Sequence, residues 1–123
     1  MASGNGDLLQ GTLGILILKA LATREMHGYG VARWIQETTG DVLQIEEGSL
    51  YPALRRLEDK GYVEARWGIS DNNRRAGFYA LTVQGREHLV ADASMWIRFA
   101  EAVMVVMRTA PALSGLSLAP EAS

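Results

Sequence analysis

One segment of the sequence carries side chains that can bind phosphates and bases, on a spacing typical of a helix. From Gly48 to Glu58 it reads GSLYPALRRLE, and Leu50, Leu54 and Leu57 recur at the interval of a helix face turned to a core. The other faces carry Ser49, Tyr51, Pro52, Arg55 and Arg56. A helix fits the major groove of DNA, where hydroxyl and guanidinium groups reach phosphates and base edges. An ordinary amphipathic helix with a solvated charged face would show the same pattern.

A second group of such side chains lies in a polar segment between two predicted strands. Residues 62–67 and 77–82 are rich in aromatic and branched side chains, which favour strands. The loop between them, which with Gly77 forms segment 68–77, holds Asn73, Arg74 and Arg75. It is typical of a wing whose basic side chains grip the DNA backbone or enter a minor groove. A polar hairpin tip would show the same composition.

The net charge of −2 argues at first sight against a nucleic-acid partner. The charge is segregated, however, because Arg55 to Arg86 contains seven basic and four acidic residues, a net of +3. The rest of the chain therefore carries −5, and the positive segment contains Arg55, Arg56 and the whole polar segment 68–77. A protein–protein interaction module, whose basic face binds an acidic partner without sequence-specific DNA binding, is the alternative interpretation.

Residues for catalysis or metal binding are scarce. The chain has no cysteine and two histidines, His27 and His88, which excludes thiol chemistry and histidine-based metal clusters. Ser49 lies outside a nucleophile elbow, and no histidine–carboxylate pair is placed to activate it. Gly28-Tyr29-Gly30 begins a dinucleotide-binding pattern, but Arg33 stands at the third glycine. We expect no enzyme activity, no cofactor and no metal.

The elements that must position these groups follow a recognisable order. Apolar periodicity predicts helices over residues 7–22, 28–39 and 49–60, with Gly40 and Gly61 ending the second and third. Pro52 would lie near the first turn of the third helix, where a proline costs little. After the hairpin, Thr82 is a suitable N-cap for a last helix reaching residue 108 or 109. Three helices and a hairpin make a winged helix-turn-helix, which is mainly α with a small β-hairpin (α+β).

The first and last predicted helices carry more apolar surface than one small chain can cover. The first holds Leu9, Leu13 and Leu16 on one stripe and further apolar residues around it. In the last helix a seam repeats at alternating intervals of four and three: Leu89, Ala93, Trp96, Ala100, Val103 and Met107. Such a seam needs a partner, and a second copy of the chain is the natural one. We therefore expect a homodimer, joined through these two helices.

We expect four parts along the chain: a disordered lead-in (1–6), a winged-helix DNA-binding domain (7–82), a dimerisation helix (83–109) and a flexible tail (110–123). No apolar run is long enough to span a membrane. The first six residues lack the features of a signal peptide. These observations predict a cytoplasmic protein without a membrane partner.

Four motifs in this order resemble the PadR family of transcriptional regulators. They are Leu8-Leu9-Gln10-Gly11-Thr12-Leu13, His27-Gly28-Tyr29-Gly30, the segment Gly48–Glu58, and Tyr79-Ala80-Leu81-Thr82-Val83-Gln84-Gly85-Arg86. The resemblance covers about residues 7–108, and Gly-Ser-Leu-Tyr-Pro-Ala-Leu is its most specific part. The single C-terminal helix is similar to the short subfamily, which dimerises through that helix.

The resemblance implies a winged-helix dimer that binds an operator on double-stranded DNA and represses transcription. Carried over by motif, the DNA-binding residues would be Tyr29, Ser49, Tyr51, Pro52, Arg55 and Arg56, with Asn73, Arg74 and Arg75 in the wing. Family members often have a basic residue near position 77. Gly77 therefore implies the loss of one phosphate contact, or a bend in the strand.

Trp96 lies on the predicted seam, where the copy from a second subunit would be close by. Some family members resemble this arrangement and hold flat aromatic ligands between such tryptophans, which makes a small aromatic effector at Trp96 one hypothesis. A tryptophan that simply packs the dimer interface is the better supported one.

Overall fold

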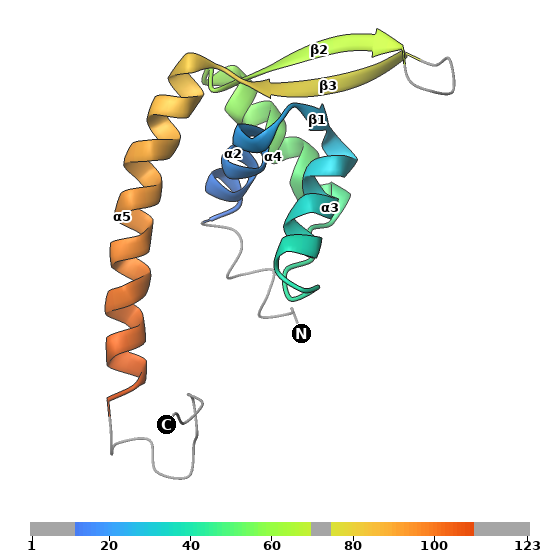
Figure 1. The fold of residues 1–123 in the computed structure, drawn as a ribbon. Coiled ribbons are helices and arrows are strands. Elements are labelled where there is room, and N and C mark those ends of the chain that lie inside the picture. The colour runs from blue at the N-terminus through green and yellow to red at the C-terminus, as the bar shows by residue number, and fades with distance from the viewer. Residues whose placement is uncertain (1–11, 70–74, 110–123) are drawn as a thin grey trace. The chain divides into compact units, whose positions relative to one another are not determined.

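The computed structural model describes residues 12–69 and 75–109 of the 123. Helix α2 (Leu13–Thr23) is followed by a short strand β1 (Met26–His27) and then by helices α3 (Gly28–Thr38) and α4 (Glu47–Asp59). Strands β2 (Val63–Ile69) and β3 (Arg75–Leu81) and a long helix α5 (Val83–Met107) follow (Figure 1). The chain forms two compact units, which meet within α5 between Val90 and Ala91. The order confirms a winged helix, mainly helical with a small antiparallel sheet.

The predicted helices are confirmed with small shifts at their ends. The start expected at Asp7 lies outside the described residues, and α2 ends at Thr23. Helix α4 begins at Glu47, two residues before the predicted start, so Pro52 lies inside the helix rather than in its first turn. The expectation that this proline costs little is therefore wrong, because Pro52 has no N–H to donate to the carbonyl of Gly48.

Both predicted glycine stops are confirmed by their hydrogen bonds. At the end of α3, Gly40 has φ +60° and donates to Glu37 O (3.2 Å), while the next N–H reaches Gln36 O (2.8 Å). At the end of α4, Gly61 has φ +82° and donates to Glu58 O (2.9 Å), while Tyr62 N–H reaches Leu57 O (2.9 Å). Each glycine thereby terminates its helix in a Schellman motif, which needs a left-handed residue.

The sheet has three antiparallel strands in the order β1-β3-β2. The hairpin was predicted and β1 was not, because two residues are too short to show a period. Val63 pairs with Leu81, Ala65 with Tyr79 and Trp67 with Gly77, and on the other edge Met26 pairs with Tyr79. Buried Val63 and Met26 mark the face turned to the helices. The far ends of β2 and β3 extend past the helices (Figure 1).

The core of the first unit lies between the helices and this face of the sheet. Its most completely buried side chains are Ile17, Leu18, Val31, Ile35, Leu50 and Leu54. The three leucines of the predicted α4 face, Leu50, Leu54 and Leu57, are all buried, as expected. On α2 the core face is wider than the predicted stripe, since Ile17, Leu18 and Leu21 are buried while Leu16 is partly exposed.

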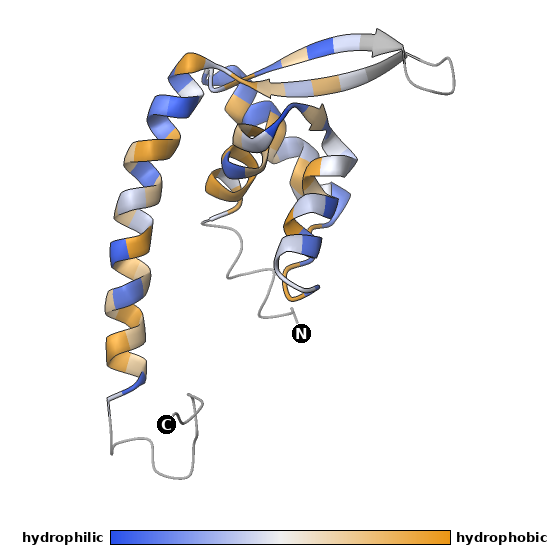
Figure 2. Ribbon diagram, in the orientation of Figure 1, coloured by the Kyte–Doolittle hydropathy of each residue, from blue (hydrophilic) through white to orange (hydrophobic). Residues whose placement is uncertain are grey.

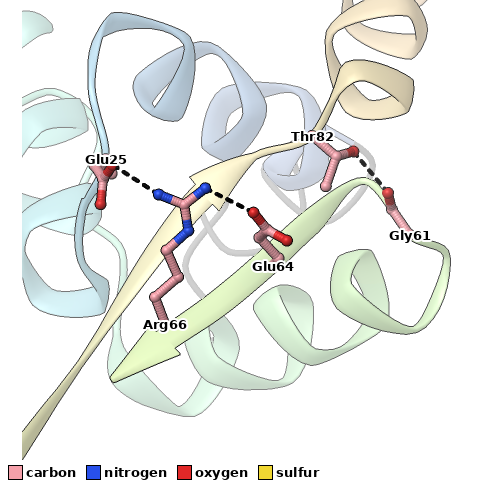
Figure 3. A network of polar contacts seen from close by, with 5 residues as sticks. All are labelled: Glu25, Gly61, Glu64, Arg66 and Thr82. Carbon is pink, nitrogen blue, oxygen red and sulfur yellow. Dashed lines mark hydrogen bonds and ion pairs between the residues drawn. The ribbon is translucent and has the colours of Figure 1, made fainter. Parts of the chain in front are cut away.

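The junction between the sheet and α5 is built around Thr82. Its hydroxyl donates to Gly61 O (2.7 Å, Figure 3). The same hydroxyl accepts from Gly85 N–H (2.9 Å), which confirms Thr82 as the N-cap of α5. Gly85 is buried, and a Cβ at this position would lie 2.0 Å from the carbonyl oxygen of Tyr62. The first turn of α5 is therefore held closely against the end of α4 and the start of β2.

Candidate nucleic-acid interface

The face of α4 opposite its leucines is the candidate reading surface. All five side chains predicted there, Ser49, Tyr51, Pro52, Arg55 and Arg56, are exposed. The buried residues Leu50, Ala53, Leu54 and Leu57 anchor the helix on its other side. Two guanidinium groups, a phenol and a hydroxyl are thus presented on a rigid helix, which suits hydrogen bonding to phosphates and base edges.

Tyr51 is a side chain of this surface whose position is defined by a close contact with the backbone of α3. Its ring lies so close to Gly28 at the start of α3 that a Cβ built on Gly28 would be 2.6 Å from Cε1 and 2.9 Å from the phenol oxygen. Partial burial, followed by the charge of Glu47 and the nearby phenols of Tyr79 and Tyr29, raises the pKa of Tyr51 above 10.0. The phenol therefore stays protonated at neutral pH and can donate a hydrogen bond to a phosphate.

Tyr29 extends the same surface onto α3. It is 59% exposed, and its ring stacks on His27 with centroids 5.1 Å apart and an interplanar angle of 8°. His27 in turn packs on Phe78 of β3 (4.1 Å), and its Nδ1 donates to Gly77 O (3.1 Å). His27 therefore links the start of α3 to β3.

The hairpin is held to the helical core by charges as well. Arg66 on β2 donates to Glu25 (3.1 Å), which precedes β1, and to Glu64 (2.7 Å) on its own strand (Figure 3). The hydrogen bond that Arg66 donates to Glu64, with the negative charges of Glu25 and Glu64, raises the pKa of the Arg66 guanidinium. The guanidinium of Arg66 therefore pairs with two carboxylates of its own chain, whereas Arg55 and Arg56 are expected to bind DNA.

The structure describes only part of the predicted wing tip. Arg75 is the first residue of β3, while Asn73 and Arg74 lie outside the described residues. Gly77 lies against the indole ring of Trp67, because a Cβ on Gly77 would lie 3.4 Å from Cζ3 and Cη2 of that ring. Trp67, which sequence reasoning did not single out, covers its partner glycine and is itself 63% exposed.

The predicted dimer residues divide into buried and exposed groups. Leu13 and Leu89 are buried within the single chain, Leu16 is partly exposed, and Leu9 lies outside the described residues. In the second unit Trp96, Val103 and Met107 are 40–44% exposed and Ala93 and Ala100 are partly exposed. The C-terminal half of α5 is predominantly hydrophobic (Figure 2).

In the described part of the chain, no three His, Asp or Glu side chains are grouped so that they could hold a metal ion. Over residues 12–69 and 75–109, no helix combines the length and hydropathy needed to cross a membrane.

Comparison with known proteins identifies relatives over most of the chain. The model of the "Transcriptional regulator PadR-like family" matches residues 17–91. An uncharacterised protein of Lysinibacillus sphaericus is 30% identical over 102 residues, which are 82% of this chain and 93% of that protein. The negative transcriptional regulator PadR of Bacillus subtilis is 29% identical over 73 residues, 59% of this chain and 40% of its own length.

Solved structures agree with this relationship. A transcriptional regulator from Clostridium thermocellum superposes with a TM-score of 0.74 at 25% identity, over 84% of this chain and 99% of that one.

Proposed function

The chain belongs to the PadR-like family of transcriptional regulators, and we propose that it is a repressor that binds operator DNA as a homodimer. Helix α4 would enter the major groove and the wing, residues 68–77, would grip the flanking backbone. The observation that carries the proposal is the exposed face of α4, which presents Tyr51, Arg55 and Arg56, with exposed Tyr29 near Tyr51. The relatives support regulation, and repression follows the name of the Bacillus subtilis protein.

Each side chain has a separate role in this proposal. Ser49, Tyr51 and Tyr29 donate to phosphates and fix the register of α4, with Pro52 packing on the backbone beside them. Arg55 and Arg56 reach base edges or phosphates from the second half of the helix. Asn73, Arg74 and Arg75 supply backbone contacts from the wing. The segment from Arg55 to Arg86, with its net charge of +3, contains the arginines of both α4 and the wing.

Dimerisation through the second unit completes the proposal. The exposed seam Trp96–Val103–Met107, with partly exposed Ala93 and Ala100, would pack on the same helix of a second copy, and Leu16 of α2 would add to this contact. Leu13 and Leu89 serve the core of their own subunit. A two-fold dimer predicts an inverted-repeat operator, with half-sites separated by whole helical turns. We expect residues 7–82 to bind DNA and 83–109 to dimerise, in the cytoplasm.

Selection of bound duplexes from a random DNA pool tests the function directly. The expected result is an inverted repeat bound by the dimer. Arg55→Ala or Arg56→Ala should then weaken binding about ten- to hundredfold, with relaxed sequence preference at the contacted base. Arg98→Ala is the matched control, because Arg98 is an exposed arginine of α5 that lies outside the proposed DNA-binding surface and off the dimer seam. An enriched pool without a common sequence would overturn the operator assignment.

The wing is tested by its salt dependence. Arg74→Ala with Arg75→Ala should weaken binding to all sequences and reduce the slope of log K against log salt by about 2, since each phosphate contact releases roughly one counterion. Unchanged affinity at every salt concentration would remove the wing from the interface. A protein–protein module that binds an acidic partner would bind no selected duplex at all, and the same gel-shift series therefore separates the two functions.

The dimer seam also suggests that a small aromatic effector binds at Trp96, in addition to DNA binding by the winged helix. Trp96 is 40% exposed in the single chain, and planar aromatic molecules stack on indole rings. Such a ligand should quench fluorescence in the wild-type protein and not in Trp96→Phe, which retains Trp34 and Trp67. An unchanged spectrum across a panel of planar aromatics would leave Trp96 as a packing residue of the dimer.

A further inference from the structure

Trp67 of β2 is a large apolar side chain that the proposed function does not use. Its indole is 63% exposed. Trp67 pairs with Gly77, and residues opposite each other in an antiparallel pair point to the same face of the sheet. Val63 and Ala65 precede it on this face at intervals of two. Because Val63 is buried against the helices, Trp67 projects on the helical side of the hairpin.

The indole is held in place by its neighbours on β3. It lies across Gly77, where a Cβ would come 3.4 Å from its six-membered ring. The carbonyl of that same glycine accepts a hydrogen bond from His27 Nδ1 (3.1 Å), which fixes this point of β3 to the start of α3. The glycine therefore leaves room that the indole occupies, and the ring is positioned relative to the helical core.

Trp67 is also continuous with the proposed reading surface. Gly77, which it covers, is two residues from Tyr79 on the same face of β3. The phenols of Tyr79 and Tyr29 are both near enough to Tyr51 to contribute to its raised pKa. An aromatic row thus runs from exposed Tyr29 through Tyr51 and Tyr79 to exposed Trp67.

We propose that Trp67 contacts the sugar–phosphate backbone of the bound DNA, in the place that a basic side chain at position 77 would otherwise occupy. The proposal rests on the proposed DNA-binding function. The exposed indole ring offers apolar area to a deoxyribose. The far ends of β2 and β3 extend beyond the helices, as a backbone contact next to the groove requires (Figure 1), and Trp67 is two residues from the C-terminal end of β2.

A neutral contact of this kind differs from an arginine contact in its salt dependence. Trp67→Ala should weaken operator binding about tenfold, as an aromatic interface contact does on truncation, without changing the slope of log K against log salt. Trp67→Phe should retain part of the affinity. Gly77→Ala, whose Cβ would touch the indole at 3.4 Å, should weaken binding less than Trp67→Ala. Val83→Ala is the control, because Val83 is 75% exposed and lies at the start of α5.

The direct test is the accessibility of Trp67 in a single-tryptophan protein. Trp34→Phe with Trp96→Phe leaves Trp67 as the only tryptophan. Acrylamide quenching is measured with and without the selected operator duplex, and binding is followed in parallel by the anisotropy of the labelled duplex. We expect the quenching constant to fall about threefold or more on binding, since well-packed contacts exclude water.

The outcomes separate this proposal from the function on which it rests. If the duplex binds and the quenching constant of Trp67 does not change, Trp67 is not a DNA contact and the proposed function is unaffected. If no duplex binds the wild-type protein, both proposals fail. Should the double phenylalanine variant be unfolded by circular dichroism, the affinities of Trp67→Ala and Trp67→Phe in the wild-type background decide, and equal affinity of all three proteins would overturn the contact.

Discussion

The ring of Tyr51 lies against the backbone of Gly28, so close that a methyl group there would be 2.6 Å from Cε1 of the ring. Helix α4 and the start of α3 are therefore in contact through a side chain of the candidate reading surface. Because one edge of the Tyr51 ring packs against the backbone of Gly28, this contact restricts the orientation of the phenol before DNA binds. Side chains held in this way lose little freedom on binding DNA.

Gly28→Ala should displace Tyr51 and weaken DNA binding about tenfold, because an added methyl group occupies the position of the ring. The free energy of unfolding should change by less than about 1 kcal/mol, since the far end of a partly exposed side chain can move aside. Gel shift and thermal unfolding measure the two effects. Gly14→Ala is the control, because its Cβ would meet only Leu57 Cδ2 at an ordinary 3.8 Å.

A double-mutant cycle shows whether Gly28 acts through Tyr51. In a Tyr51→Ala background, adding Gly28→Ala should cost no further affinity, because the ring that it displaces is already absent. Additive losses would mean that Gly28 matters for another reason.

The ionisation of Tyr51 gives a pH dependence whose sign is fixed by its surroundings. Partial burial, then the charge of Glu47 and the neighbouring phenols, raises its pKa above 10.0. A group whose pKa is raised on folding contributes stability that is complete below its unfolded pKa and is lost as pH rises through the folded one. The difference in alkaline ultraviolet titration between wild type and Tyr51→Phe should therefore show a phenol ionising above 10.0. Glu47→Gln should bring that ionisation to lower pH, and no movement would contradict the assigned charge effect.

The sequence predicts elements whose signals are local. The four-residue and three-residue intervals of Leu50, Leu54 and Leu57 identify the buried face of α4, and hence its exposed face. Gly61 and Thr82 mark a helix end and a helix start because the chemistry of a stop or cap lies within a few residues. These signals were sufficient for a winged helix.

The contacts that shape the candidate site are not local, and no period in the sequence reports them. His27 and Gly77 are 50 positions apart, and Arg66 and Glu25 are 41 apart. Strand β1 has two residues and exists because β3 offers it an edge. The sequence identifies Trp67 only as a strand residue, and the strand register is needed to show that it pairs with Gly77. Tertiary pairing, which propensity does not encode, determines each of these.

Thr82→Ala should lower the free energy of unfolding by about 1–2 kcal/mol, because it removes the N-cap bond to Gly85 N–H together with the bond to Gly61 O. Thr82→Ser keeps the hydroxyl and should restore most of the loss. Urea denaturation followed by circular dichroism gives both values. Equal stability of the alanine and serine variants would show that the hydroxyl does not hold this junction.

Gly85→Ala should be far more damaging, with a loss of about 3 kcal/mol or more, because the clash at 2.0 Å is with the backbone carbonyl of Tyr62 and cannot be relieved by a side chain. The thermal midpoint of unfolding measures the effect. Gly48→Ala, in which the new methyl group meets nothing within 4 Å, should be neutral or slightly stabilising and controls for helix propensity. A Gly85→Ala protein with the wild-type midpoint would contradict the close approach at this turn.

Two exposed valines of α5 test the dimer seam against the rest of the helix surface. Val103 lies on the seam and is 40% exposed, and Val105, two residues on, lies on the opposite side of the helix and is 67% exposed. Val103→Asp should shift the protein from dimer to monomer in analytical ultracentrifugation, since an unpaired carboxylate in an apolar interface costs several kcal/mol. Val105→Asp should remain dimeric at the same concentration. If both variants dissociate or neither does, the seam is not where the subunits meet. Loss of operator binding should accompany dissociation, because an inverted repeat is bound tightly only when both reading helices belong to one dimer.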